Sequence, residues 1–269
     1  MPVPLARRVL LAMCVSLVLQ ASQNALSGVI SPRDVQGPPV LPMLDFEEPA
    51  DSASTFEGLE NPSGTAAVMA IRHGRWSQAC NIATRILARK VPNVEALGIF
   101  ALCEAIRNDR EAANRALERL LQTEAKPGYY GLLTEGVLHL REGLPEKAES
   151  TFREVLRSRS GDPLALFFSG EALHARHKDA EAILSFKAVL KTWPDHAPAL
   201  TAIARLLATP KASRDKLKEA LALTERATSI DPSNLAHWRL LAELCRRTGQ
   251  HDRANAIAIQ WLQGPPRVR

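Results

Sequence analysis

The sequence predicts an all-α fold in which pairs of helices stack one upon another. A spacing of 34 residues recurs in the last two thirds of the chain, where it separates Gly136 from Gly170 and Phe152 from Phe186. Prolines punctuate this pattern at regular intervals, and proline suits the first turn of a helix but not its interior. A fixed period of this length is typical of a helical-repeat array.

The repeat can be extended in both directions. It gives six units: residues 60–93, 94–127, 129–162, 163–196, 197–234 and 235–268. Two positions in every unit hold only Ala or Gly, and such small residues let two helices approach to about 8–10 Å. The eighth positions are Ala67, Ala101, Gly136, Gly170, Ala204 and Ala242. The twentieth positions, counted without the four extra residues of the fifth unit, are Ala79, Ala113, Ala148, Ala182, Ala220 and Ala254.

Residues 1–25 are predicted to be a signal peptide. Arg7 and Arg8 precede an apolar run of eleven residues that ends at Leu19, and small residues suited to cleavage follow. This run is shorter than the roughly 20 residues that a membrane-spanning helix needs. Export is therefore the favoured interpretation, and an uncleaved anchor, a lipid-modified Cys14 and an organelle presequence are the alternatives.

Residues 26–59 are predicted to be a disordered, Pro-rich acidic tether. Residues 26–60 carry a net charge of −6, although the whole chain carries +5. Within this stretch, residues 40–48 (VLPMLDFEE) place apolar side chains among acids, as peptides that bind in grooves do. Two interpretations remain open: a solvated spacer, or a segment that docks on its own basic helical array or on a partner.

Three cysteines remain if the signal peptide is removed. Cys80 falls on the second helix of the first unit and Cys103 on the first helix of the second unit, so the two lie on elements that pack together. Such a pair forms a disulfide in an oxidising compartment, or two small buried thiols elsewhere. The sequence leaves this choice open, and Cys245 is the third cysteine.

The sequence favours a protein that is not an enzyme and has no cofactor. Glycine patterns of nucleotide-binding loops and the Gly-x-Ser-x-Gly motif of hydrolases are absent. Glu171, His174 and His177 recur every three residues, but no fourth ligand accompanies them, so no metal site is predicted. Basic residues alternate with Glu on the predicted outer faces, which argues against nucleic acid as a partner. Membrane contact is expected only through the signal segment.

The repeat resembles the tetratricopeptide repeat (TPR) over residues 60–268. The family-typical residues of the last units are Pro232, Trp238, Leu241, Ala242, Gly249 and Ala254. The resemblance implies a right-handed α-solenoid of about six helix pairs. It also implies that the first helix of each pair lines a concave groove that binds protein rather than catalyses a reaction.

Family-typical groove positions give a candidate binding surface. They are Leu102, Tyr130, Leu133, Val137, Phe167, Glu171, His174, Arg205, Arg239, Glu243 and Arg246. An apolar strip beside a basic end suits an extended peptide with hydrophobic anchors and acids. Leu133 and Phe167 have an alternative role, which is to complete the core between adjacent units.

The C-terminal unit supplies a second candidate surface. Helical arrays usually end with a polar helix that covers the last apolar face. Here the last predicted helix instead carries Ile257, Ile259, Trp261 and Leu262. We expect these residues to mediate self-association into a homo-oligomer or docking of a partner.

These observations together predict a non-enzymatic protein–protein interaction scaffold that is exported to the periplasm or cell envelope. There it would assist assembly of a secretion, pilus or polysaccharide-export apparatus. One alternative is a cytosolic or organellar adaptor or co-chaperone, if the leader is not a signal peptide. Another is an accessory subunit of a periplasmic enzyme-maturation complex.

Overall fold

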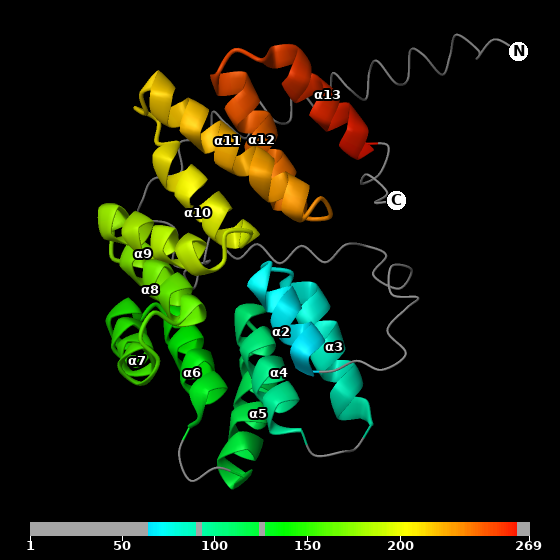
Figure 1. The fold of residues 1–269 in the computed structure, drawn as a ribbon, viewed down its shortest axis with the longest axis vertical. Coiled ribbons are helices and arrows are strands. Elements are labelled where there is room, and N and C mark those ends of the chain that lie inside the picture. The colour runs from blue at the N-terminus through cyan, green and yellow to red at the C-terminus, as the bar shows by residue number, and fades with distance from the viewer. Residues whose placement is uncertain (1–63, 90–92, 124–126, 263–269) are drawn as a thin grey trace, which may run out of the picture. The chain divides into compact units, whose positions relative to one another are not determined.

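The structure is a computed structural model that describes residues 64–89, 93–123 and 127–262 (Figure 1). Within these ranges it contains twelve α-helices and no strand. The predicted signal peptide and acidic tether lie outside the described residues. The helices are α2 (Gly64–Arg72), α3 (Trp76–Ala88), α4 (Val94–Ile106), α5 (Arg110–Thr123), α6 (Tyr129–Arg141), α7 (Pro145–Ser158), α8 (Pro163–Ala175), α9 (Asp179–Thr192), α10 (Ala197–Leu207), α11 (Arg214–Ile230), α12 (Leu235–Arg247) and α13 (His251–Leu262).

Consecutive helices pack as six antiparallel pairs, α2 with α3 through α12 with α13, which confirms the predicted all-α solenoid. The chain itself dictates where several of these helices begin. The Asp162 side chain accepts a hydrogen bond of 2.9 Å from the Ala165 amide, and Pro163 occupies the first turn of α8. Asn93 caps α4 in the same way through the Ala96 amide at 2.7 Å. Such caps satisfy amides that have no partner inside the helix.

Glycine at the eighth position of two units makes room for an aromatic ring in the same unit. A Cβ on Gly170 would lie 2.6 Å from Cε1 of Phe186, and a Cβ on Gly136 would overlap the ring of Phe152. Both rings are fully buried. The four units with Ala at this position have smaller residues in place of the ring: Ala83, Leu117, Thr224 and Ala258. The residue at the eighth position is therefore smaller where the side chain that it faces is larger.

The junction between the second and third pairs differs from the others. Helix α6 packs mainly on α4, whereas at the other junctions the second helix of one pair contacts the first helix of the next. Gly98 permits this close approach, because a Cβ there would lie 2.6 Å from Cβ of Tyr130. A pocket lies at this junction, lined mainly by α4 and the start of α6.

The first helix pair also contacts pairs far away in the sequence. We call residues 73–76, at the turn between α2 and α3, the clasp. Trp76 lies 6.0 Å from Phe168 of α8, measured between ring centroids, and Pro198 of α10 packs against Gly74. The Ala197 amide donates a hydrogen bond of 3.4 Å to the His73 carbonyl. In an open array each repeat touches only its neighbours, so this chain closes the first pair onto the fourth and fifth (Figure 1).

A disulfide joins Cys80 of α3 to Cys103 of α4, with a Cα–Cα distance of 5.7 Å. Both residues are fully buried, and Cys245 is a buried free thiol. The bond ties the pair that carries the clasp to the second pair. Of the two roles that the sequence left open for these cysteines, the structure has the disulfide.

Candidate peptide-binding site

The apolar half of the predicted groove belongs to the core. Leu102, Leu133, Val137 and Phe167 are all 0% exposed. Phe167 contacts the rings of Phe168 and Phe186, with centroids 5.4 Å and 5.6 Å away. These side chains therefore fill the space between helices, which is the alternative role that the sequence allowed for two of them.

The basic half of the predicted groove contains a pocket, which we call the arginine pocket. It has a volume of about 320 Å³ and lies between α10 and α12, the first helices of the last two pairs. Arg205 comes from α10 and Arg239 from α12, while Leu240 and two alanines supply apolar wall. Its lining residues are Arg205, Ala208, Ala236, Arg239, Leu240 and Glu243. Three predicted groove residues thus meet here.

Two arginines that line one pocket can bind a carboxylate through charge-assisted, bidentate hydrogen bonds. The charge of Glu243 makes the pocket less positive. However, the Glu243 carboxylate lies 4.0 Å from Arg247, which does not line the pocket, and the Glu243 side chain is more than half exposed. The pocket can therefore hold an acidic side chain with an apolar neighbour against Leu240.

Glu171 of α8 adds a buried carboxyl group near this pocket. Its residue exposure is 1%, and Oε1 has no hydrogen-bond partner among the described residues. Burial raises its pKa to about 8, and the positive charges of Arg205 and Arg141 act in the opposite direction. At neutral pH the group is therefore largely protonated, and it is not among the residues that line the pocket.

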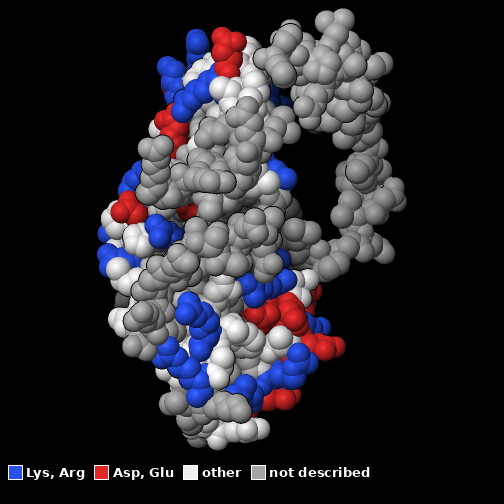
Figure 2. All heavy atoms as spheres, turned by 90° about the vertical axis from the view of Figure 1, so that its right-hand side faces the viewer, with Lys and Arg blue, Asp and Glu red and all other residues white. Residues whose placement is uncertain are grey.

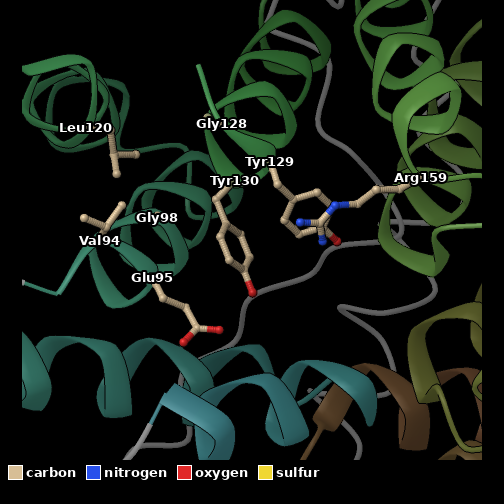
Figure 3. A pocket seen from close by; sticks show the side chains of 9 residues that line it. Val94, Glu95, Gly98, Leu120, Gly128, Tyr129, Tyr130 and Arg159 are labelled. Atoms are coloured by element: carbon tan, nitrogen blue, oxygen red, sulfur yellow. The ribbon is translucent and has the colours of Figure 1, made fainter. Parts of the chain in front are cut away.

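A second pocket, the tyrosine pocket, lies between α4 and the start of α6, with Leu120 supplied by α5 and Arg159 by the residue after α7 (Figure 3). Its volume is about 350 Å³. In Figure 3 the carboxylate of Glu95 points towards the hydroxyl of Tyr130, and Val94 and Leu120 lie on the opposite wall. Tyr130 is the one predicted groove residue among those that line it.

Tyr129 is held rigidly at the edge of the tyrosine pocket. Its hydroxyl donates a hydrogen bond of 3.1 Å to Asp162, and the guanidinium carbon of Arg159 lies 4.1 Å from the centre of its ring. Burial, followed by the charge of Asp162, raises the pKa of Tyr129 far above its usual range. Burial, with Glu95 nearby, raises the pKa of Tyr130 to about 12. Both hydroxyls stay neutral, so the pocket offers aromatic surface and hydrogen bonds.

Sequence reasoning missed Tyr129 and Arg159 as pocket residues. The Tyr-Tyr pair after Pro127-Gly128 was the available signal, because it starts the third unit where no other unit has two aromatics. The pocket itself depends on the close contact of α6 with α4, which no local pattern in the sequence shows.

His174 lies outside both pockets. Its Nδ1 is 2.7 Å from the Asp179 carboxylate at the corner between α8 and α9. His177 sits in the next turn with a positive φ of 59°. Glu171 is buried in α8, His174 pairs with Asp179 and His177 lies in the turn after α8, so the three side chains do not form one site. Within the described ranges, no three His, Cys, Asp or Glu side chains are grouped to hold a metal ion.

Two arginines at the ends of first helices have a structural role. Arg247 donates to the Ala208 carbonyl at 2.5 Å and to the Thr209 carbonyl at 2.6 Å, and so covers the end of α10. Arg141 does the same for the Ile106 carbonyl at the end of α4. Positive groups stabilise the C-terminal carbonyls of a helix. Arg246, the predicted groove residue next to Arg247, is exposed.

The C-terminal surface is described only in part. Ile257 is 7% exposed and packs into the core of the last pairs, whereas Ile259 is 55% exposed. The side chains of Trp261 and Leu262 lie outside the described residues. Self-association through this helix stays a prediction.

Acidic and basic side chains are interspersed on the face shown in Figure 2, as on an ordinary solvated helical surface. Elsewhere on the helices, ion pairs such as Arg153–Glu149 at 2.5 Å and Arg253–Glu225 at 2.5 Å join the two kinds of charge. Among the helices that the structure describes, none has the length and apolarity required to span a membrane.

The repeated helix pairs, the close packing at small residues and the inner pockets define a helical-repeat domain that serves protein–protein contacts. A family model described as "Tetratricopeptide repeat" matches residues 133–197. This match identifies residues 133–197 as tetratricopeptide repeats.

Comparison with solved structures supports this fold. The structure of yeast Tom70 is similar with a TM-score of 0.54 and 16% identity, covering 76% of this chain and 43% of that one. The structure of PilW, described as a type IV pilus biogenesis factor, has a TM-score of 0.50 and 16% identity, covering 75% and 91%. A CTR9 homolog of Arabidopsis thaliana is 30% identical over 161 residues, which are 59% of this chain and 14% of the relative. The chain thus spans a small part of that relative's length.

Proposed function

We propose that this protein is a non-enzymatic scaffold that holds an extended, acidic segment of a partner protein in the arginine pocket. The observation that carries the proposal is that Arg205 of α10 and Arg239 of α12 line the same pocket together with Leu240. A peptide with a carboxylate flanked by apolar residues matches this chemistry. The tyrosine pocket offers a second anchor for an aromatic or aliphatic side chain.

We further propose that the protein works in the cell envelope, where it assists assembly of a secretion, pilus or polysaccharide-export apparatus. The signal-like residues 1–25 support export. The buried Cys80–Cys103 disulfide supports an oxidising compartment, because cytosolic thiols are kept reduced. N-terminal sequencing of the mature protein tests this part: an intact leader would contradict it.

Site-specific photo-crosslinking in intact cells tests the binding site. A benzophenone amino acid replaces Leu240, which lines the arginine pocket, or Leu184, which is 68% exposed on α9. We expect a defined partner adduct at position 240 and none at position 184.

Charge neutralisation completes this test. Arg239→Gln, added to the variant that carries the crosslinker at position 240, should reduce the adduct at least tenfold, because a carboxylate contact is lost. Identical adducts at both positions, or an adduct that does not depend on Arg239, would contradict the proposed site.

A further inference from the structure

We propose that residues 40–48 of the chain itself bind in the arginine pocket and compete there with the partner. This inference rests on the proposed function, since it assigns the same pocket a second, intramolecular ligand. The partner then has to displace a tethered segment before it can bind.

The chemistry of the segment matches that of the pocket. Asp45, Glu47 and Glu48 supply three carboxylates for Arg205 and Arg239. Between and before them, Phe46 and Leu44 offer apolar side chains to Leu240 and the alanines of the wall. Residues 26–60 as a whole carry a net charge of −6, and no other stretch of the sequence is comparably acidic.

The clasp brings the pocket within reach of the segment. Helix α2 begins at Gly64 and has nine residues, so its start lies about 14 Å from its end at a rise of 1.5 Å per residue. The His73 carbonyl then lies 3.4 Å from the Ala197 amide at the start of α10. Arg205 follows eight residues along α10, about 12 Å further. With allowance for side chains, the path is about 35 Å.

Fifteen residues connect Glu48 to Gly64. Fully extended they span about 50 Å, at roughly 3.3–3.6 Å per residue. The connection is therefore long enough without being stretched. A short flexible connection gives an effective concentration in the millimolar range, so a segment with an intrinsic dissociation constant near 100 µM would occupy the pocket about 90% of the time.

The test uses full-length protein and a fluorescein-labelled peptide of residues 40–48 added in trans. Fluorescence polarisation compares wild type with the triple variant Asp45→Asn, Glu47→Gln, Glu48→Gln, in which the tethered segment has lost its carboxylates. We expect the variant to bind the free peptide about tenfold more tightly than wild type, because its pocket is no longer occupied. The difference should shrink as salt is raised.

Two pairs of arginine substitutions provide the matched controls. Added to the triple variant, Arg205→Gln with Arg239→Gln should abolish peptide binding. Arg153→Gln with Arg157→Gln, on the exposed face of α7, should leave it unchanged.

The outcomes separate the two proposals. Equal, tight binding by wild type and triple variant would overturn the intramolecular contact and leave the acidic-peptide site intact. Binding to neither protein would overturn both. Binding that survives loss of Arg205 and Arg239 would place the peptide elsewhere and would also overturn the inference.

Discussion

Single residues show how tightly the repeats of this protein are matched inside each pair. Gly136 and Gly170 face the rings of Phe152 and Phe186, whereas units with alanine at this position have smaller partners. A glycine inside a helix costs about 1 kcal/mol relative to alanine. Glycine is nevertheless favourable at these two positions, because the ring occupies the space that the methyl group of an alanine would need.

Substitution of this glycine should therefore destabilise the protein. Gly136→Ala is expected to lower the free energy of unfolding by about 1–2 kcal/mol, because overpacking outweighs the gain in helix propensity. In a Phe152→Leu background the same substitution should be neutral or stabilising. Urea denaturation of the four proteins of this double-mutant cycle measures the coupling. An equal loss in both backgrounds would show that the ring is not the cause.

At the scale of the element, the histidine that caps α10 makes the stability of the protein depend on pH. Nδ1 of His196 accepts a hydrogen bond of 3.3 Å from the Ala199 amide and so caps α10. The ring is fully buried against Phe167 and Trp193. Burial, with His73 nearby, lowers its pKa to about 3. Protonation would remove the acceptor and place a charge in the core at the same time.

Acid should therefore destabilise the protein through His196. Its folded pKa lies below the unfolded value of about 6.5, so its contribution to stability is complete above that pH and falls by about 1.4 kcal/mol per unit towards pH 3. In His196→Asn, which keeps a capping side chain, the loss between pH 7 and pH 5 should be about 1–2 kcal/mol smaller. Urea denaturation at both pH values measures it. His177→Asn, at an exposed turn, is the control and should retain the full loss.

At the scale of the whole molecule, the described part of the chain is held by contacts that a simple array lacks. The disulfide joins the first two pairs, and the clasp places the first pair on the fourth and fifth. The disulfide reduces the conformational freedom of the unfolded chain, whereas the clasp contributes packing and a hydrogen bond to the folded state. The first pair, which has one neighbouring pair, gains stability from both.

Loss of the disulfide should be measurable as a loss of stability. Cys80 and Cys103 are 23 residues apart, and closing such a loop contributes about 3 kcal/mol. Cys80→Ala with Cys103→Ala should therefore reduce the free energy of unfolding by about this amount. A reductant should lower the stability of wild type similarly and leave the double variant unchanged. Insensitivity of wild type to the reductant would contradict a stabilising disulfide.

Much of the fold could be predicted because its determinants are local and periodic. The capping residue Asp162 and the proline Pro163 start α8 through interactions within a few residues, and small residues at fixed spacing allow helices to cross closely there. The candidate site was harder to predict from the sequence. Arg205 and Arg239 were predicted as groove residues and do share a pocket, but Phe167 and Leu133 carry the same positional pattern and are buried.

The sequence by itself determined the repeat period, the number of helix pairs and the residues at which helices cross, because these follow from short-range spacing. The tertiary structure alone decided three other matters: the pairing of Cys80 with Cys103, the contact of α6 with α4 that opens the tyrosine pocket, and the clasp. Each depends on the angle between consecutive pairs. That angle results from the summed packing of many side chains, and a small change in it decides which distant residues meet.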